Sequence, residues 1–576
     1  MGEVRNADVA HILREIAVFL EMQGVAFKPR AFEKAAISIE NATEHIVELY
    51  EKRGLKGLQE IPGVGASIAE KIEEFLKTGK IGFHEELKKK VPVDLNSFTG
   101  IEGVGPKSIL KLYQKLKIHN VEELEKAAEG GKIREIGGFG AKTEENILKS
   151  ITAAKGSSGR MPLQSIMPEV HALEERLRNI KGVEQLTIAG SIRRRKEMVG
   201  DIDILAVAKD PEIVMEYFVT MPNVARVYAQ GPTKSAVRLA LGLDADLRVV
   251  PKESYGAALN YFTGSKDHNV ALRQIAIKKK LKLNEYGLFK GKKQIAGETE
   301  EELYAAFGMD YIEPELRENS GELEAATNHT LPNLIGYKDL KGDLQMHTNW
   351  TDGRESVETM AKGAAARGLQ YIAITDHTKR LAMMRGLDEK RVRAQWKEIE
   401  EANKKLRGTI TVLKGTECDI LKDGSLDLSD EVLAKMDVVG VSVHSYFNLP
   451  REAQTERIIR AIRNPHVDIL FHPTGRIVGR RPPYDVDMEK IIKVAKETGT
   501  ILEVDSFERL DLKDEYVRKC VQAGVKIAID SDAHIPAHFG FLEYGIAQAR
   551  RGWATAKDVV NTLSLDKMLR SLKKSR

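Results

Sequence analysis

The spacing of hydrophobic residues changes twice along the 576-residue chain and divides it into three regions. Through about the first 150 residues, apolar positions recur at helical intervals and predict helices. In the middle region, "DIDILAV" has the period of two that predicts a strand. Beyond residue 335, short apolar runs alternate with helical segments. We therefore expect a multidomain protein with an α-helical N-terminal region, an α+β middle region and a β/α C-terminal region.

The helical region contains a repeat of an apolar residue, a Gly-x-Gly turn and an amphipathic helix. Its copies are "IPGVGASIAEKIEEFLKTG", "IEGVGPKSILKLYQKL" and "IGGFGAKTEENILKSI". Glycines permit a tight turn and close backbone approach, and free N–H groups at a helix start bind phosphate. One copy alone would be as well explained by a plain helical hairpin, but three copies resemble helix–hairpin–helix DNA-binding motifs. The glycines predicted to contact DNA are Gly63, Gly65, Gly103, Gly105, Gly138 and Gly140.

The middle region follows a Gly/Ser-rich break, "AAKGSSGRMP", which predicts a linker. In "GSIRRRKEMVGDIDIL", strand periodicity places Asp201 and Asp203 on one face, after a Gly-Ser turn and an arginine cluster. A further strand, "LDADLRVVP", has Asp246 and Arg248 on one face. Carboxylates suit Mg²⁺, while N–H groups and guanidinium groups suit a polyphosphate. An isolated D-x-D is usually a solvated strand end, but the longer spacing favours a nucleotide site.

Four motifs in this order resemble a family X DNA polymerase, the group that includes the repair polymerase beta. They are "GSIRRRKEMVGDIDIL", "DLRVVP", "YFTGSKDHNVALR" and "LNEYGL", and the resemblance covers roughly residues 1–317. It implies a helical lyase-like DNA-binding domain (1–90), a helix–hairpin–helix fingers-like domain (91–155), a nucleotidyltransferase palm (160–260) and a nucleotide-selecting thumb (261–317). It also implies that gapped or primer–template DNA and deoxynucleoside triphosphates are the substrates.

The resemblance assigns roles to individual residues. Asp201, Asp203 and Asp246 would bind catalytic Mg²⁺, and Arg248 with Glu285 would form a switch that closes the subdomains. The residues implied to bind the nucleotide are Ser191, Arg194, Gly200, Tyr261, Phe262, Gly264, Lys266, Asn269 and Arg273. Lys266 departs from the family pattern, because polymerase beta has an aspartate there.

The resemblance also suggests a 5′-deoxyribose phosphate lyase with Lys71 as its Schiff-base lysine. Such a lysine needs a desolvated or cation-flanked amine with a lowered pKa. Phe27, Ser67 and Phe32 replace the histidine, lysine and tyrosine that support the reaction in polymerase beta. We therefore favour the alternative that Lys71 contacts a DNA phosphate.

The C-terminal region contains seven apolar runs separated by helical segments. They are "DLQMH", "YIAITDH", "TVLKGTE", "VVGVSVH", "VDILFH", "ILEVDS" and "KIAIDSDAH". A single such histidine is usually a polar strand cap. Six of these seven runs, however, end in His, Glu or Asp-x-His, all except "ILEVDS". Reactive residues at the C-terminal ends of successive strands are typical of a β/α-barrel active site.

This set resembles the polymerase and histidinol phosphatase (PHP) domain, over about residues 336–576, and implies a distorted seven-stranded barrel. The matching metal ligands are His347, Asp352, His377, Glu417, His444, His472, Asp532 and His534. Mixed imidazole and carboxylate ligands suit Mn²⁺ or Zn²⁺ better than Mg²⁺. Gln345 replaces the first histidine of the family, and its amide oxygen would be a weaker ligand.

The net charge and the cysteine content narrow the functional classes only slightly. Lys+Arg 89 against Asp+Glu 85 gives a net charge of +4, which neither requires nor excludes nucleic acid. The only cysteines are Cys418 and Cys520, which excludes a disulfide framework and suits a reducing cytosol. The sequence contains neither a signal-peptide pattern nor a membrane span of ~20 apolar residues. We expect a cytoplasmic monomer without a membrane partner, in which the polar residues 318–335 link the two modules.

The functional hypothesis is a DNA-directed DNA polymerase that fills short gaps in DNA repair. Its PHP domain would act as a metal-dependent 3′–5′ exonuclease with abasic-site or 3′-end processing. Two alternatives remain for the PHP domain. It would be a small-molecule phosphatase similar to histidinol phosphatase, or a structural or DNA-binding module.

Overall fold

The computed structural model describes residues 6–25, 27–40, 46–98, 101, 104–156 and 159–573. The chain forms two compact units, Met1–Ser158 and Gly159–Arg576. Within the described residues, the helices are too short or too polar to cross a membrane.

The first unit is helical, as predicted. Its helices are α1 (Asn6–Met22), α2 (Lys28–Glu40), α3 (Ile46–Gln59), α4 (Ala66–Thr78), α5 (Gly82–Lys90), η1 (Leu95–Phe98), α6 (Pro106–Leu116), α7 (Val121–Glu129) and α8 (Ala141–Gly156). One apolar cluster runs through all of it, from Leu13 and Phe19 in α1 to Leu112 in α6 and Ile147 in α8. The helices that follow the three Gly-x-Gly turns are α4, α6 and α8.

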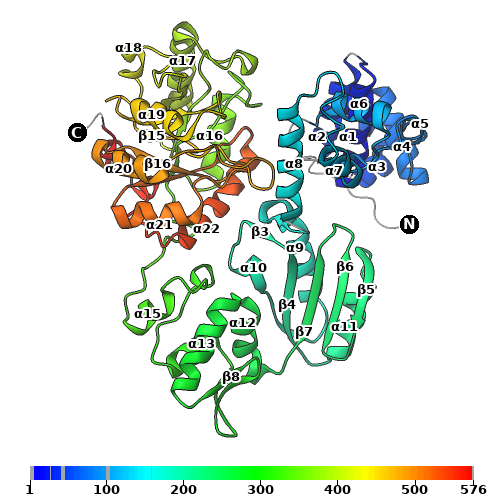
Figure 1. Cartoon of the computed structure of the whole chain (residues 1–576), viewed down its shortest axis with the longest axis vertical. Coiled ribbons are helices and arrows are strands. Elements are labelled where there is room, and N and C mark those ends of the chain that lie inside the picture. The colour runs from blue at the N-terminus through cyan, green and yellow to red at the C-terminus, as the bar shows by residue number, and fades with distance from the viewer. Residues whose placement is uncertain are drawn as a thin grey trace. The chain divides into compact units, whose positions relative to one another are not determined.

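The palm of the second unit is a five-stranded sheet of order β2-β4-β7-β6-β5. Its strands are β2 (Val183–Ile188), β4 (Asp201–Ala208), β5 (Val224–Gln230), β6 (Lys234–Leu239) and β7 (Asp244–Val249). The remaining elements are β1 (Met161–Pro162), β3 (Met198–Val199), α9 (Leu163–Arg178), α10 (Gly190–Arg193) and α11 (Pro211–Thr220). Strands β4 and β7 are parallel neighbours with Asp203 opposite Asp246 (Figure 1). This register brings the predicted metal-binding carboxylates to one end of the sheet.

The thumb follows the palm and pairs helices with a small antiparallel sheet of order β10-β9-β8. Its elements are η2 (Lys252–Ser254), α12 (Tyr255–Thr263), α13 (Lys266–Lys278), β8 (Lys282–Asn284), β9 (Gly287–Lys290), β10 (Lys293–Ala296), α14 (Glu300–Ala306) and η3 (Pro314–Leu316). The segment 318–335, expected to be a linker, contains α15 (Glu322–Thr327), and Leu323 and Ala326 pack into the thumb core. Buried apolar residues at helical spacing make this segment part of the thumb.

The C-terminal region is a parallel sheet of seven strands in chain order, as predicted. The strands are β11 (Gly342–Asp343), β12 (Tyr371–Ile374), β13 (Thr411–Asp419), β14 (Val438–Ser442), β15 (Ile469–Leu470), β16 (Ile501–Asp505) and β17 (Ile527–Asp530). The intervening and following helices are α16 (Val357–Ala366), η4 (Ala382–Met384), α17 (Glu389–Lys405), α18 (Asp430–Leu433), α19 (Arg451–Ile462), α20 (Met488–Thr498), α21 (Asp514–Ala523), η5 (Pro536–Phe541), α22 (Leu542–Arg551), η6 (Val560–Thr562) and α23 (Leu565–Ser571). A parallel bridge between Met346 and Ala533 nearly closes the sheet into a barrel.

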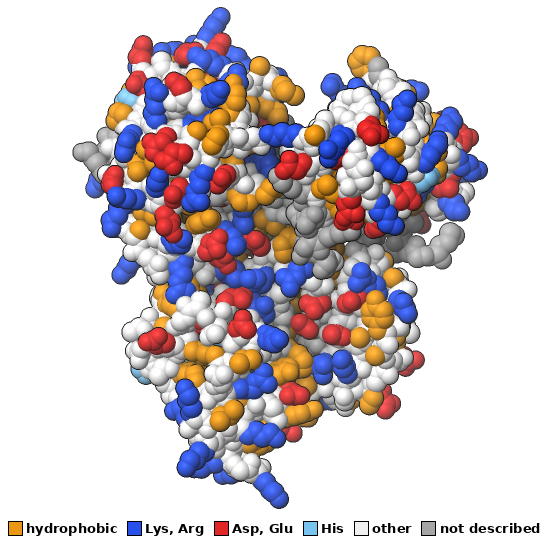
Figure 2. Space-filling view, in the orientation of Figure 1, with side chains coloured by type: hydrophobic (Ala, Val, Ile, Leu, Met, Phe, Trp, Pro, Cys, Tyr) orange, Lys and Arg blue, Asp and Glu red, His pale blue; other side chains and the backbone are white. Residues whose placement is uncertain are grey.

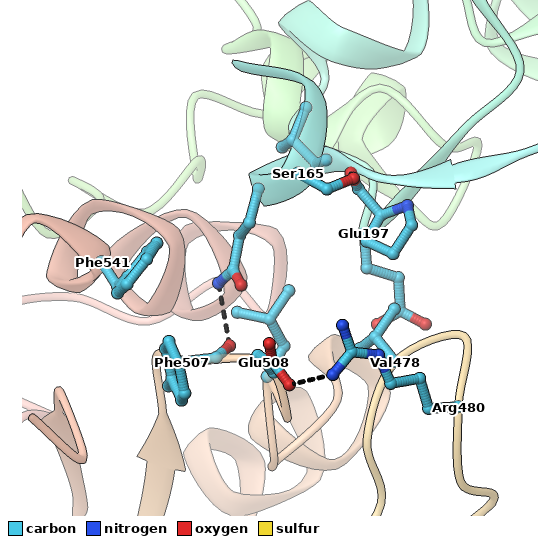
Figure 3. Close-up of a pocket in the computed structure, with 11 residues that line it drawn as sticks. Ser165, Glu197, Val478, Arg480, Phe507, Glu508 and Phe541 are labelled. Atoms are coloured by element: carbon cyan, nitrogen blue, oxygen red, sulfur yellow. Dashed lines mark hydrogen bonds and ion pairs between the residues drawn. The ribbon is translucent and has the colours of Figure 1, made fainter. Parts of the chain in front are cut away.

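The palm packs directly on the barrel within the second unit. Val478, Leu510 and Tyr544 of the barrel belong to the apolar cluster of the palm. Arg476 forms a two-pronged ion pair with Glu197, with Nη2 2.8 Å from Oε2 and Nη1 3.2 Å from Oε1. A cavity of about 150 Å³ remains beside this contact, between Ser165 and Glu197 on one side and Phe507 and Phe541 on the other (Figure 3). The contacts join the palm and the barrel through polar and apolar side chains.

Charge is distributed evenly over the visible surface. Lys and Arg side chains are interspersed with Asp and Glu on the face drawn in Figure 2. The face drawn therefore has no extended field of one sign.

Candidate active sites

The predicted nucleotide-binding residues line one cavity between palm and thumb, with a volume of about 450 Å³. The predicted residues on its wall are Ser191, Arg194, Gly200, Asp201, Asp203, Tyr261, Phe262, Gly264, Lys266, Asn269 and Arg273. The cavity is open and polar, as a charged triphosphate and a DNA end would require. Arg160, which the sequence analysis missed, also lines it. No motif marks Arg160, because it lies beside the Gly/Ser-rich break and reaches the cavity only in the folded chain.

Three carboxylates meet at the end of strands β4 and β7. Burial, together with the charges of Asp201 and Asp246, raises the pKa of Asp203 to about 7. Burial and Asp246 also raise the pKa of Asp201. Like charges at this spacing repel one another unless protons or cations neutralise them. Hard oxygen ligands of this kind fit Mg²⁺, and a cation could neutralise the cluster in place of protons.

The turn before β4 brings the backbone close to these carboxylates. Gly190 has a φ of +62°, and a Cβ there would collide with the carboxylate of Asp203. The adjacent Ser191 hydroxyl is buried and has no hydrogen-bond partner among the described residues. A buried hydroxyl that lines the cavity without a partner is available to a phosphate oxygen.

Arg194 is held by both the palm–thumb junction and the barrel. Its Nε lies 3.1 Å from Oε1 of Glu318, and its Nη1 donates to the carbonyl of Thr263. Arg551, at the end of α22 in the barrel, contacts the same Glu318 oxygen at 3.1 Å and donates to the Arg194 carbonyl at 2.8 Å. Neither Glu318 nor Arg551 is marked by a motif, and the sequence analysis missed both.

The predicted sugar- and base-contacting residues lie around the start of α13. Asn269 Nδ2 donates to the carbonyl of Tyr261 at 2.7 Å, and the Tyr261 ring lies edge-on to Phe262. Arg248 lies over the Phe262 ring, 4.6 Å from its centroid. Among the residues that the structure describes, no ion pair joins Arg248 to Glu285. The predicted switch therefore stays a prediction.

The barrel brings all eight predicted ligands together at the C-terminal ends of its strands. Glu417, within β13, is the centre of the cluster. Its carboxylate oxygens lie 3.3 Å from His347, 3.0 Å from His377, 3.1 Å from His444 and 2.7 Å from His472. Asp532 lies 3.0 Å from His347, and Asp352 lies 3.4 Å from His377 and 3.3 Å from His534. Three groups of three ligands have donor atoms within 4.8 Å of one another.

The chemistry of this cluster fits divalent metal ions. Burial would lower the pKa of His347, but Asp532 and Glu417 raise it well above its usual value. Burial would raise the pKa of Glu417, but His444 and His377 lower it well below its usual value. Ring nitrogens of His347 and His377 are also buried, and they lie 3.0 Å from the carboxylates of Asp532 and Glu417 without the angles of a hydrogen bond. When these histidines and carboxylates are deprotonated, their lone pairs and negative charges are suited to bind metal cations.

Gln345 lies behind this cluster with its side chain fully buried. When its amide is oriented to suit its neighbours, the amide nitrogen donates to the carboxylate of Glu503, 3.1 Å from Oε2. Glu503 also accepts the backbone N–H of His472 at 2.6 Å. Glu503 therefore fixes the Gln345 amide, a contact that the sequence analysis did not predict.

The run "ILEVDS", which does not end in a predicted metal ligand, is followed by an arginine that lies beside the cluster. Arg509 follows β16, with its Nε 3.1 Å from Asp505 and 3.8 Å from Asp532. A cation at this position can offset the acidic charge of the barrel and contact an anionic substrate. No motif marks Arg509, which lies three residues after the run, and the sequence analysis missed it.

The first glycine of a helix–hairpin–helix turn is needed for the backbone conformation of that turn. Gly63 has a φ of +87° and Gly138 a φ of +97°, in the left-handed region that other residues rarely adopt. Gly103, the predicted equivalent in the second turn, lies outside the described residues.

The second glycines are not required by the fold. Gly65 and Gly105 have a φ of −82°, and a Cβ at either position, or at Gly140, would meet nothing within 4 Å. Gly65 and Gly105 are the N-cap residues of α4 and α6, where glycine is common, and the open space also permits close approach of a partner. The helix starts beside them offer free N–H groups.

Lys71 lies on α4 in polar surroundings. Its Nζ is 3.3 Å from the carbonyl and the hydroxyl of Ser67, and 5.3 Å from the centroid of the Phe83 ring. Phe27 is 87% exposed, whereas Phe32 is buried in the core. Among the described residues, these contacts provide neither a deeply buried amine nor a neighbouring cation, and the phosphate-contact role of Lys71 stays a prediction.

Family models match four segments of the chain. They describe a helix-hairpin-helix domain (4–81), a SAM-like helix-hairpin-helix tandem (95–152), a DNA polymerase beta thumb (258–318) and a PHP domain (343–507).

Similar proteins cover either the whole chain or the barrel. "DNA polymerase/3′-5′ exonuclease PolX" of Bacillus subtilis (strain 168) is 37% identical over 581 residues, which cover 99% of this chain and 100% of that protein. A protein named "probable phosphatase" from Thermoanaerobacter sp. (strain X514) is 31% identical over 38% of this chain and 90% of its own length. Another "probable phosphatase", from Acetivibrio thermocellus, is 33% identical over 32% of this chain and 75% of its own length.

Proposed function

This chain belongs to the PolX family, the family X DNA polymerases that carry a C-terminal PHP domain, and we propose that it fills short gaps during DNA repair. The family predicted from the sequence is thereby confirmed. The protein is a DNA-directed DNA polymerase with a 3′–5′ exonuclease, and it acts on DNA and nucleotides with the help of metal ions. The observation that carries the repair proposal is that one chain has a cavity for nucleotide addition and a ligand cluster for 3′-end removal.

For synthesis, we propose that Asp201, Asp203 and Asp246 hold Mg²⁺. Mg²⁺ would lower the pKa of the primer 3′-hydroxyl and neutralise charge on the leaving pyrophosphate. The Ser191 hydroxyl and the Arg194 guanidinium would orient the triphosphate, and Tyr261 with Phe262 would hold the sugar. Arg194 would exchange its contact with Glu318 for phosphate oxygens when the nucleotide enters.

For degradation, we propose that the eight clustered ligands hold Mn²⁺ or Zn²⁺, which would supply an activated hydroxide and stabilise phosphate charge. Glu417 would be the central ligand, because four histidines approach its two oxygens. Arg509 would orient the scissile phosphate. We further propose that the enzyme is a monomer and that the same site removes abasic or damaged 3′ ends.

A small-molecule phosphatase is the second candidate for the barrel, because barrel relatives bear the name "probable phosphatase". The two functions differ in substrate size. A 3′-labelled oligonucleotide should lose its terminal nucleotide as a monophosphate, whereas histidinol phosphate and other small monoesters should release phosphate slowly. The reverse order of rates would favour the phosphatase.

The second glycine of a hairpin tests the phosphate-binding role. Gly65→Val should weaken binding to gapped DNA about tenfold and reduce its salt dependence, because a side chain would hold the backbone away from a phosphate. The conformation and open space at Gly65 predict that folding is unaffected. Binding is measured by fluorescence anisotropy between 50 and 200 mM salt, with Gly65→Ala as the smaller control. An unchanged affinity and salt slope would contradict a DNA contact at this turn.

Because Gln345 replaces the first histidine ligand of the family, we expect one metal ion of the barrel to bind weakly. In Gln345→His, one ring nitrogen would donate to Glu503 and leave the other for a metal ion, so half-maximal degradation should need roughly tenfold less Mn²⁺. Gln345→Leu should need more Mn²⁺ than the wild type, and nucleotide addition should be the same in all three. Mn²⁺ titrations of both activities, with metal content measured alongside, test this. Identical titration curves and metal contents would show that residue 345 does not influence an ion.

A further inference from the structure

The rim of the PHP barrel carries an unusual group of exposed residues beside the metal-ligand cluster. Among the described residues from 336 to 573, four large hydrophobic side chains are exposed, and three of these lie on the loops after β12 and β14. They are Met383 (95% exposed), Met384 (42%) and Tyr446 (45%). The same two loops begin with the clustered ligands His377 and His444, whose rings are 5.0 Å apart. Because these three side chains are exposed, they do not contribute to the hydrophobic core of the barrel.

Tyr446 lies close to the metal-ligand cluster because it is near His444 in the sequence. It follows His444 by two residues, so their Cα atoms are at most ~7.6 Å apart. Its φ of +58° is in the left-handed region, which is unfavourable for a bulky residue. A strained conformation of this kind is characteristic of functional sites. Arg457 donates to the adjacent carbonyl of Ser445 at 2.8 Å and so fixes the loop.

Cations surround the Tyr446 ring. The charged groups of Arg380, Lys422 and Arg457 lie 5.8, 5.6 and 5.7 Å from its centroid, respectively. Arg380 also donates to the Tyr446 hydroxyl at 3.4 Å. Among the described residues, neither Arg380 nor Lys422 has a carboxylate partner for its side chain. Both are therefore available to phosphate groups.

We infer that Tyr446, Arg380 and Lys422 form a platform that binds the unpaired 3′ end of a DNA strand. An aromatic face stacks on a base of any sequence, and neighbouring cations bind its phosphates. A base in a duplex is already stacked and cannot use this platform, so the platform selects unpaired 3′ ends. The inference rests on the proposed exonuclease function and assigns Tyr446, Arg380 and Lys422 as the residues that hold the end of the strand.

The test compares Tyr446→Asn with the wild type, because asparagine removes the ring but adopts left-handed backbone readily. Degradation of a single-stranded oligonucleotide should show a KM raised about tenfold. Hydrolysis of bis(4-nitrophenyl) phosphate, which needs the metal ions but not a platform, should stay within about twofold of the wild type. Tyr446→Phe should restore oligonucleotide degradation. Tyr217→Ala, which removes another exposed tyrosine (41%) on the palm, is the matched control.

Removal of the base from the substrate provides the complementary test. Oligonucleotides with one abasic residue at the first, second or third position from the 3′ end identify the stacked base. At one position the wild type should lose about tenfold in kcat/KM, and Tyr446→Asn should not distinguish the abasic from the intact substrate. Such non-additivity identifies a direct contact.

Three results would overturn the inference. Equal losses on the oligonucleotide and on the small ester would show that Tyr446 only supports the metal cluster. Additive effects of the variant at all three abasic positions would exclude stacking. A wild-type protein that hydrolyses the small ester but leaves oligonucleotides intact would overturn the exonuclease function itself, and the platform with it.

Discussion

We expect Asp203→Ala to lower the rate of nucleotide addition by roughly three orders of magnitude or more. The reason is that the variant loses a metal-binding carboxylate, metal ions contribute several kcal/mol to such reactions, and each ~1.4 kcal/mol is a tenfold change in rate. Asp203 lies opposite Asp246 on the neighbouring strand, and burial, Asp201 and Asp246 raise its pKa to about 7. Primer extension on gapped DNA with Mg²⁺ measures the loss.

The same variant should still degrade 3′ ends, because none of the eight barrel ligands lies in the palm. Asp244→Ala is the control on the neighbouring strand β7, because Asp244 lies opposite Asp201 but its carboxylate pairs with Arg238 at 2.9 Å. It should keep most of the nucleotide addition. Loss of both activities in a folded Asp203→Ala protein would contradict separate sites.

His377→Ala and Asp532→Ala should silence degradation by a comparable factor and spare synthesis. His377 contacts both Glu417 and Asp352, and Asp532 contacts His347, so each change removes a ligand from at least one group of three. Release of nucleotide monophosphate from 3′-labelled DNA in Mn²⁺ measures the effect.

His466→Ala is the control for these variants, because His466 precedes β15 and so lies at the opposite end of the barrel from the ligands. It should leave degradation within about twofold of the wild type, as expected for a surface substitution. If degradation persisted in both His377→Ala and Asp532→Ala, the nuclease would have to lie elsewhere in the chain.

The sequence predicted those features that depend on periodicity and on strand ends. A period of two placed Asp201 and Asp203 on one face, and parallel strands must deliver the residues at their C-terminal ends to one rim. Hence a β/α barrel with ligand-type residues such as His347 and Glu417 at one rim followed from the pattern, whereas their roles as metal ligands followed from the family resemblance. The grouping of Asp246 with Asp201 and Asp203 followed from the family resemblance rather than from spacing, and the structure adds that Asp246 lies opposite Asp203.

Contacts between distant segments could not be predicted. Arg551 reaches Glu318 and the Arg194 carbonyl across more than 200 residues of sequence, and no local pattern records such a contact. Residues 318–335 were expected to be a linker because they are polar overall, but the buried Leu323 and Ala326 decide their packing. Gln345 was recognised as a departure from the family, yet its contact with Glu503 depends on the closed barrel.

One assay on a single DNA tests the central claim that this chain trims and extends with two separate sites. The substrate is 5′-labelled gapped DNA whose primer ends in a mismatch, incubated with all four nucleotides, Mg²⁺ and Mn²⁺. The wild type should shorten the primer and then extend it across the gap, whereas Asp203→Ala should only shorten it. His377→Ala should leave the mismatched primer unchanged yet extend a matched one. Shortening by His377→Ala, or extension by Asp203→Ala, would contradict the account.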